Sequence, residues 1–360
     1  MTRRRRAAAV LLVALAAVAG YRYAQAGRAR HIADVGGEMA ALPAGDGGWV
    51  AWLEREGEDT RLLSLRRGGR ETRVVLESPG MSGLAVAGGE AFVTRRRDAG
   101  RGRGAAEFLR VDLESGAARE VAALPWPAEQ VVFDNGFLLW REYRESPLSE
   151  VPFVVAAAPV HVIRTRREGS GEMATVAVIA GGTKSRPGGV SLVGAAGGYG
   201  YWVERRREEG AGSTVIRRVA LPQGRPETLV RERGLQEAVL VEEALLWTAP
   251  SLEAVDEHLY AAVKRLPFDS SEPEAVADWL EADGELLACD GLGYFRERRR
   301  LWVLGDARGE QRVHSLGPPT GVKARVVGDE EYVLMRTGSG LAVASRPLTW
   351  WARVGRTVRP

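Results

Sequence analysis

The stretch Gly48-Trp49-Val50-Ala51-Trp52 decides the fold, because variants of it recur along the whole chain. Each variant begins with Gly or an acidic residue, continues with a short aromatic and aliphatic run, and carries a large apolar residue four positions after its first. The other six are Gly89-Glu90-Ala91-Phe92-Val93, Gly136-Phe137-Leu138-Leu139-Trp140, Gly198-Tyr199-Gly200-Tyr201-Trp202, Glu243-Ala244-Leu245-Leu246-Trp247, Gly291-Leu292-Gly293-Tyr294-Phe295 and Asp329-Glu330-Glu331-Tyr332-Val333. The last residues of these seven markers are 41, 47, 62, 45, 48 and 38 positions apart. Apart from the one long interval, this spacing is close to the period of four-stranded β-propeller blades, roughly 40–50 residues.

Further apolar runs complete each blade. Short runs of small side chains precede the markers at 81–87, 130–133, 190–193, 238–241, 286–288 and 324–327, and they suit the innermost strand, where the blades converge and leave little room. Third runs follow at 62–65, 108–111, 215–219 and 301–303, and more polar fourth runs at 72–76, 228–230 and 312–314, as expected of a half-exposed outer strand. We therefore predict an all-β chain, a β-propeller of seven four-stranded blades over residues 27–349, preceded by an N-terminal hydrophobic helix. A strand from either 30–35 or 351–358 closes the ring, and residues 350–360 form a C-terminal strand or a Trp/Arg tail.

The aromatic residues of the markers have a structural explanation. Blades pack face to face, and a Trp or Phe at one fixed position fills the wedge between neighbours, so the 10 Trp of the chain are mostly scaffold. One segment conflicts with the strand pattern, because Leu252, Val255, Leu259, Ala262, Val263 and Leu266 fall at helical spacing. The 48-residue interval around it leaves no room for an added helix, so we predict strand there.

In organisation the chain resembles the YWTD-type and TolB-type propellers of exported bacterial proteins. The resemblance covers about residues 37–348 and rests on the markers quoted above. The chain lacks the Tyr-Trp-Thr-Asp tetrapeptide, the Trp-Asp dipeptide of the WD40 group and the Asp-box of sialidases. The resemblance implies a rigid disc used for binding, and it carries over no functional residue.

The first 26 residues have the composition of an export signal. Four arginines at 3–6 precede an apolar run from Ala7 to Tyr21, and Ala24-Gln25-Ala26 fits a small-x-small cleavage site. We expect either a cleaved signal peptide or an uncleaved signal anchor. Both place the rest of the chain outside the cytoplasm, because the arginines stay inside.

The charge balance argues against nucleic acid as a partner. The chain has 50 basic and 47 acidic residues, and five of the arginines lie in those first 26 residues, which contain no Asp or Glu. The remainder has 45 basic and 47 acidic residues, so the net charge of +3 becomes −2 without the N-terminal segment. Nucleic acid binding requires a basic excess clustered on one face.

The sequence contains no recognisable catalytic or metal-binding motif. The four histidines, His31, His161, His258 and His314, occur singly on different predicted blades, and Cys289 is the only cysteine, so we predict no metal site, no disulfide and no cofactor. The paired carboxylates Glu208-Glu209, Glu242-Glu243 and Glu330-Glu331 fall in predicted turns, where solvation explains them.

Three segments are candidates for interaction. One is the C-terminal tail around Trp350 and Trp351, which either lies at a bilayer interface or completes the last blade. The 62-residue interval contains an apolar insertion that includes Tyr143, Val151, Phe153 and Val154, and such a loop packs on the disc, docks a partner or dips into the membrane. The connections between outer and inner strands line one mouth of the channel. They carry a basic and aromatic rim for an anionic or carbohydrate-like ligand, formed by Trp126, Gln130, Lys184, Arg186, Arg233, Gln236 and Lys323.

These observations predict a non-enzymatic, extracytoplasmic β-propeller that serves as a protein-binding or ligand-binding platform at the cell envelope. An envelope protein is the expected partner. The alternative is a propeller enzyme, a lyase or hydrolase acting on an extracellular polymer, whose catalytic groups converge from different blades at the central channel.

Overall fold

The computed structural model describes the chain from residue 16 to residue 347 with gaps. The gaps are 23–24, 26–27, 46–47, 68, 70, 98–105, 127, 135, 146–158, 171, 181, 184–185, 188, 207–212, 242–243, 252–259, 282–283, 290–291, 298–300, 305–310, 314–320, 328–329 and 338–339. Residues 16–22 of the N-terminal apolar run are helical. Within the described residues, no helix has the length and apolarity that a transmembrane span requires.

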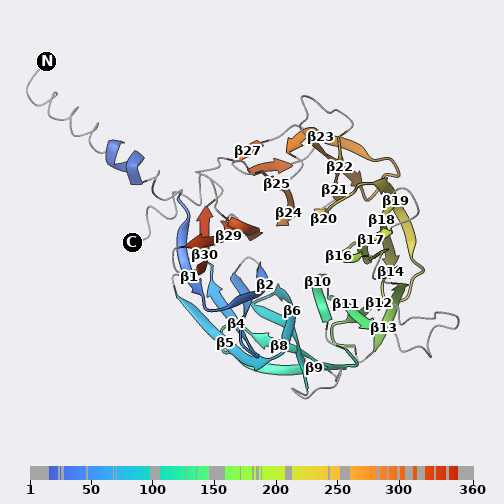
Figure 1. Ribbon diagram of the computed structural model, residues 1–360, viewed down its shortest axis with the longest axis horizontal. Helices are drawn as coiled ribbons and strands as arrows, with labels where there is room; N and C mark the ends of the chain where they lie inside the picture. The colour runs from blue at the N-terminus through green and yellow to red at the C-terminus, as the bar shows by residue number, and fades with distance from the viewer. Residues whose placement is uncertain are drawn as a thin grey trace, which may run out of the picture.

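The described strands form seven four-stranded antiparallel sheets around a central opening, so the all-β propeller with four-stranded blades is observed (Figure 1). Six sheets consist of strands consecutive in the chain. The first three are β2(Glu38–Gly45), β3(Trp49–Glu56), β4(Asp59–Arg66) and β5(Thr72–Pro79); β6(Met81–Ala87), β7(Glu90–Arg96), β8(Ala106–Asp112) and β9(Ala118–Leu124); and β10(Ala128–Asp134), β11(Phe137–Glu145), β12(Pro159–Arg167) and β13(Met173–Ala180).

The next three sheets follow the same order, after a small hairpin of β14(Gly182–Thr183) and β15(Arg186–Pro187). They are β16(Gly189–Ala196), β17(Tyr199–Arg206), β18(Ser213–Ala220) and β19(Glu227–Arg233); β20(Ala238–Val241), β21(Ala244–Pro250), β22(Tyr260–Pro267) and β23(Glu274–Glu281); and β24(Glu285–Cys289), β25(Leu292–Arg296), β26(Leu301–Leu304) and β27(Gln311–Val313).

The last sheet closes the ring with strands from both ends of the chain. It contains β28(Gly321–Val327), β29(Glu330–Thr337) and β30(Gly340–Pro347), and its outermost strand is β1(Arg30–Val35), which pairs antiparallel with β30. Of the two closing strands expected from the sequence, 30–35 is therefore the one observed. The other, 351–358, lies outside the described residues.

The sequence markers coincide with the second strand of each sheet. Their last residues lie on β3, β7, β11, β17, β21, β25 and β29. The inner runs predicted at 81–87 and 238–241 match β6 and β20 residue for residue, and the segment with helical spacing enters β22 at Tyr260, so strand is confirmed from there to Pro267.

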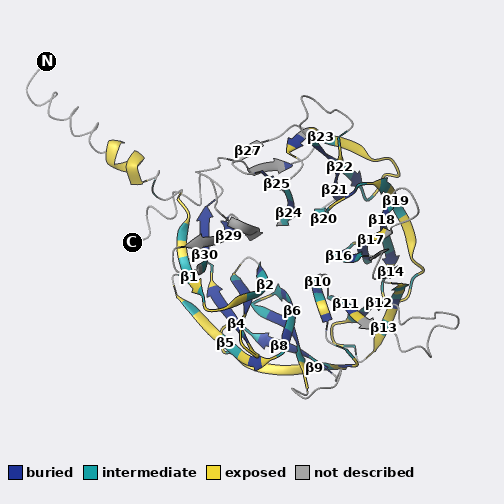
Figure 2. Cartoon of the chain, viewed as in Figure 1, coloured by how far each residue is buried: buried dark blue, intermediate teal, exposed yellow. Residues whose placement is uncertain are grey.

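Aromatic side chains fill the contacts between neighbouring sheets, as the sequence predicts. Trp140 packs with Phe92 and Phe108 of the preceding sheet, with the Phe108 and Trp140 ring centroids 5.7 Å apart. Trp52 packs with Tyr332 of the closing sheet in the same way. Buried residues lie between the sheets, whereas the outermost strands are exposed at the rim (Figure 2).

A buried carboxylate accompanies the marker Trp in several sheets, a feature that the sequence interpretation missed. Three indole N–H groups donate to the glutamate two positions further along the same strand: Trp52 to Glu54 at 2.7 Å, Trp140 to Glu142 at 3.1 Å, and Trp202 to Glu204 at 3.0 Å. In two of these sheets an arginine of the third strand completes the group, Arg164 with Glu142 at 3.0 Å and Arg217 with Glu204 at 2.9 Å. All three glutamates are at most 5% exposed.

The same arrangement survives where the glutamate is missing from the strand. Position 249 is Ala, and the indole of Trp247 donates instead to Glu232 of β19 in the neighbouring sheet, at 2.6 Å. The ammonium of Lys264 on β22, opposite Trp247 in register, also donates to Glu232. The structure therefore conserves the indole, the carboxylate and the cation while changing the strand that supplies the carboxylate.

The interpretation of Glu330-Glu331 as solvated turn residues is wrong. Both lie on β29 and are buried, at 8% and 0% exposure. Glu330 accepts a hydrogen bond from the hydroxyl of Tyr332 at 2.9 Å, and Glu331 pairs with Arg296 at 2.9 Å and with Arg346. The other two acidic pairs lie outside the described residues.

We predict that Glu204→Ala lowers the free energy of unfolding by about 3–5 kcal/mol, because it removes the acceptor of the buried Trp202 indole and leaves the partly buried Arg217 without its partner. Urea denaturation followed by Trp fluorescence measures the change. The matched control is Glu227→Ala, which removes the partner of Arg218, the next residue of β18, and whose side chain is 52% exposed. Its expected cost is below about 1 kcal/mol, and equal losses in the two variants would contradict the prediction.

Candidate binding face

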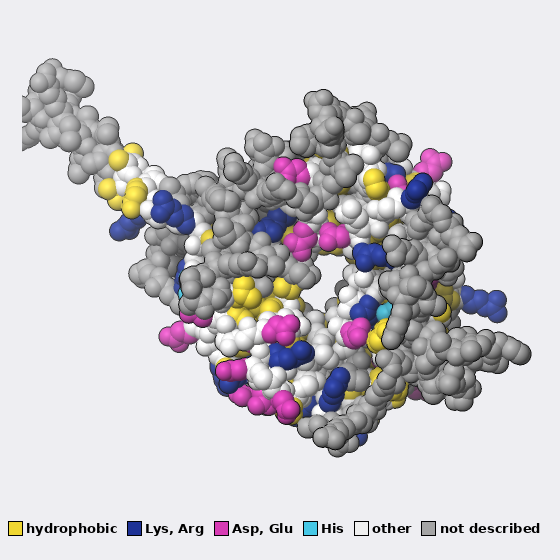
Figure 3. Space-filling model, in the orientation of Figure 1, with side chains coloured by type: hydrophobic (Ala, Val, Ile, Leu, Met, Phe, Trp, Pro, Cys, Tyr) yellow, Lys and Arg dark blue, Asp and Glu magenta, His cyan; other side chains and the backbone are white. Residues whose placement is uncertain are grey.

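One face of the disc gathers the ends of strands that carry polar side chains. In each antiparallel sheet the first strand begins, the second ends, the third begins and the fourth ends on the same side. We call this side the crossover face, because the chain passes here from the outer strand of one sheet to the inner strand of the next. Figure 3 shows one side of the disc, with acidic and basic side chains around the central opening.

Two arginines on this face tie their sheets to the next sheet in the ring. Arg141, directly after the marker Trp140, donates to the carbonyl of Val190 on the next inner strand. Arg205 donates to the carbonyl of Gln236, just before the inner strand β20, at 2.5 Å. Arg141 also forms an ion pair with Glu129 at 2.6 Å. Its guanidinium therefore holds the two sheets together.

Side-chain acceptors and hydroxyls add further ties between inner strands. The amide oxygen of Gln130 accepts from the backbone N–H of Leu192 at 2.9 Å, and Glu237 accepts from that of Leu286 at 2.7 Å. Ser82 and Thr94 both donate to the carbonyl of Ala128, at 2.9 and 3.2 Å. These bonds fix the inner strands around the channel.

The described residues of the predicted rim lie at two crossovers: Trp126 precedes β10 and Gln130 lies on it, whereas Arg233 ends β19 and Gln236 precedes β20. The inner strands β10, β16 and β20 contact one another in turn. Trp126 is half-buried in the bend between β9 and β10, and Gln130 is half-buried in the tie to Leu192. Arg233 at the end of β19 and Gln236 before β20 are exposed. The side chains of Lys184, Arg186 and Lys323 lie outside the described part of the chain, although the backbone of Arg186 is on β15 and that of Lys323 is on β28.

The apolar insertion begins later than the sequence indicates. Tyr143 belongs to β11 rather than to the connection, and β12 already starts at Pro159. Val151, Phe153 and Val154 lie outside the described residues.

Tyr143 pairs in register with His161 on the crossover face, and their ring centroids are 5.2 Å apart. His161 is 6% exposed and Tyr143 is 40% exposed. The β14–β15 hairpin, which spans positions 184 and 186, contacts β12 through β14. The structure therefore places β14 against β12, the strand that pairs with the Tyr143 strand β11.

The sequence does not single out His161, which is a lone histidine on a strand that also carries three arginines. No spacing signal distinguishes it, since its neighbour Tyr143 lies on the other side of the long insertion. Within the residues that the structure describes, no three His, Cys, Asp or Glu side chains come together in a way that could hold a metal ion.

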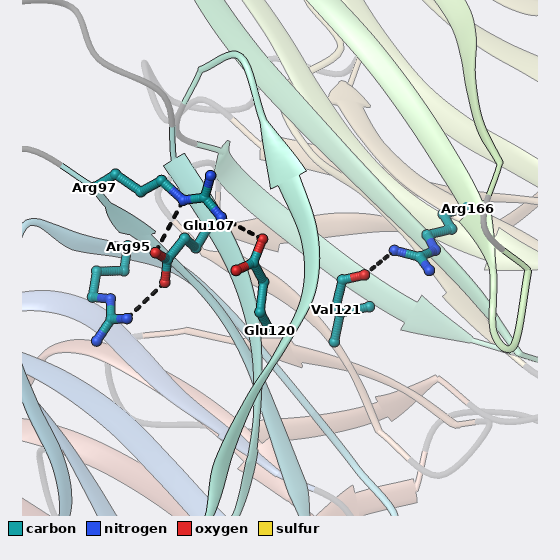
Figure 4. Close-up of polar contacts among 6 residues, drawn as sticks. All are labelled: Arg95, Arg97, Glu107, Glu120, Val121 and Arg166. Atoms are coloured by element: carbon teal, nitrogen blue, oxygen red, sulfur yellow. Dashed lines mark hydrogen bonds and ion pairs between the residues drawn. The ribbon is translucent and has the colours of Figure 1, made fainter.

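A charged cluster lies further out on the same face. Glu107 is held by Arg95 at 2.6 Å and by Arg97 at 3.0 Å, and Arg97 also reaches Glu120 at 2.6 Å (Figure 4). The hydrogen bond from Arg95 is the main cause that holds the pKa of Glu107 below its ordinary value near 4.5. Arg166 of the next sheet donates to the carbonyl of Val121 beside this cluster.

Comparisons with known proteins support the fold and no more. A scan against models of known protein families finds no match, and a search among curated proteins finds none either. Solved structures match at low identity. Oligogalacturonate lyase from Vibrio parahaemolyticus gives a TM-score of 0.62 at 11% identity, over 89% of this chain and 91% of that chain.

Two further solved structures also match at low identity. The β-propeller domain of the Trilobed protease from Pyrococcus furiosus gives a TM-score of 0.56 at 15% identity, over 87% of this chain and 98% of that chain. That propeller has an open velcro topology, whereas here β1 pairs with β30. TolB from Acinetobacter baumannii matches with a TM-score of 0.44 at 10% identity, over 83% of this chain and 63% of that chain.

We predict that Glu107 makes the stability of the protein depend on pH in the acid range. A lowered pKa in the folded state stabilises the fold fully above the ordinary value near 4.5, and this stabilisation is lost as the pH falls through the lowered pKa. Glu107→Gln should therefore destabilise the fold by about 1 kcal/mol at pH 7, and this loss should shrink as the pH falls through the lowered pKa. Denaturation at a series of pH values measures this, and the exposed Glu172→Gln is the control; a loss that does not depend on pH would refute it.

Proposed function

We propose that the protein is a non-enzymatic β-propeller that serves as a rigid platform at the cell envelope and binds a protein partner through the crossover face of the β10–β13 sheet. The observation that carries this proposal is the position of Tyr143. Its partly exposed ring lies near the end of β11, in register with the buried His161 of β12. A partly exposed tyrosine on a rigid surface is an anchor of the kind that protein interfaces favour.

The rigidity of this face supports a binding role. Arg141, Gln130 and Glu129 hold each other or the next inner strand, so the backbone around Tyr143 is fixed before any partner arrives. A preorganised surface loses little conformational freedom on binding. The ties therefore favour recognition by a surface that does not rearrange.

Location outside the cytoplasm is part of the proposal and rests on the sequence. The arginines at 3–6 and the apolar run that follows are an export signal or anchor. An anchored disc would meet its partners at the membrane surface, and a cleaved one would meet them in solution beyond it.

A second candidate function is an enzyme acting on an extracellular polymer, as a lyase or hydrolase. One observation favours it: Tyr143 and His161 are side chains that take up and release protons, and their rings are in contact on the crossover face. Proton transfer by such groups is what polymer cleavage requires. Oligogalacturonate lyase, a propeller of nearly the same length, shows that the fold accommodates such chemistry.

We predict that a photocrosslinking phenylalanine analogue at position 143, introduced in the native cells, captures one dominant envelope protein. The same analogue at Val74, 48% exposed on the outer strand β5, is the control and should not capture that protein. Mass spectrometry of the crosslinked species measures the outcome.

Two results would contradict the proposal that the protein is a binding platform. Identical capture at positions 143 and 74 would show that the crossover face is not the binding surface. Recovery of polysaccharide, together with cleavage of that polymer by the purified protein and loss of cleavage in His161→Gln, would establish the enzyme instead.

A further inference from the structure

The outermost strand β13 differs from the other outer strands of the propeller. Its sequence, Met-Ala-Thr-Val-Ala-Val-Ile-Ala over Met173–Ala180, contains no charged residue. The other six outer strands, β1, β5, β9, β19, β23 and β27, each contain at least one Arg, Asp or Glu. Charges on an edge strand protect it against pairing with another chain, and β13 lacks this protection.

The strand also exposes apolar side chains. Val178 is 67% exposed and Met173 is 39% exposed, which places both among the few large hydrophobic residues on the described surface. An exposed valine on an edge strand loses contact with water when another strand is added beside it.

One edge of β13 has no strand beside it. It hydrogen-bonds to β12 on one side and ends the sheet β10-β11-β12-β13 on the other, among the residues that the structure describes. Figure 1 shows β13 at the outer rim of the disc. A second chain can therefore reach this edge without meeting the other sheets.

The exposure pattern of β13 is self-complementary. A register irregularity lies between the partners of Ile163 and Arg164, where Val176 is the extra residue. It shifts the alternation so that the four exposed positions are Met173, Thr175, Val178 and Ala180. These four positions are symmetric about the centre of the strand: an antiparallel copy places Met173 opposite Ala180 and Thr175 opposite Val178, all on one face.

We propose that β13 pairs antiparallel with β13 of a second copy of this chain, about a two-fold axis, so that two discs join edge to edge through a continuous eight-stranded sheet. The symmetric pattern fits an identical partner, because a two-fold interface brings the same surface from both copies together. The absence of charge fits it too, because an identical charged strand would bring like charges near each other across the axis.

The test is sedimentation velocity of the full chain from about 1 to 200 µM, a range suited to a small interface. Wild type and the control Val74→Lys, an exposed valine on the charged strand β5, should shift together from monomer to dimer as concentration rises. Val178→Lys should remain monomeric at every concentration while keeping the circular dichroism spectrum of wild type. A monomeric wild type, or a dimer that persists in Val178→Lys, would overturn the proposal.

A disulfide test identifies the register directly and does not depend on a destabilising charge. In a Cys289→Ser background, which removes the single cysteine of the chain, the pair Thr175→Cys and Val178→Cys should form a covalent dimer under mild oxidation. Val74→Cys in the same background should not. Failure of the 175/178 pair to crosslink, or crosslinking of position 178 to a different protein in its place, would show that the occupant is not a second copy.

Discussion

The structure depends on how an indole N–H is satisfied in the wedge between two sheets. A Trp at the end of a marker is large enough to fill that wedge, but its ring nitrogen is a donor that cannot be buried without an acceptor. Glu54, Glu142 and Glu204 supply the acceptor from the same strand. A buried carboxylate in turn requires a cation, which Arg164 and Arg217 provide from the third strand. Packing, hydrogen bonding and charge neutralisation are thus linked in one group in each of these sheets.

This link explains why the chain tolerates variation in its repeats. Where the strand offers Ala249, the acceptor comes from Glu232 across the sheet boundary, with Lys264 as the cation. In the closing sheet the marker position is Val333, and the adjacent Tyr332, which packs on Trp52 of the next sheet, donates its hydroxyl to Glu330 two positions before it. The physical requirement is kept while the residues that meet it move.

The strand order of the propeller could be predicted because it follows from a period in the sequence. The marker residues are large, apolar and regularly spaced, and each falls on a second strand. The buried glutamates could not be predicted in the same way, because an acidic pair such as Glu330-Glu331 has the composition of a turn. Only the neighbouring strands reveal that Arg296 and Arg346 pair with Glu331. A polar residue is interpreted correctly from sequence when its partners are near in the chain, and these two arginines come from a different sheet and a different strand.

The same limit applies to the crossover face. Gln130 was predicted as a ligand-binding residue from its place in a connection, and the structure shows its amide oxygen bonded to Leu192 of the next sheet. Arg141 and Arg205 also tie neighbouring sheets together. Their only signal in the sequence is that each follows a marker Trp within a few residues. Polar groups near the mouth of a propeller therefore serve two demands, cohesion of the ring and recognition of a partner. The side chains that remain for recognition are those with exposed surface and no role in the ties, which is why Tyr143 rather than Gln130 carries the functional argument.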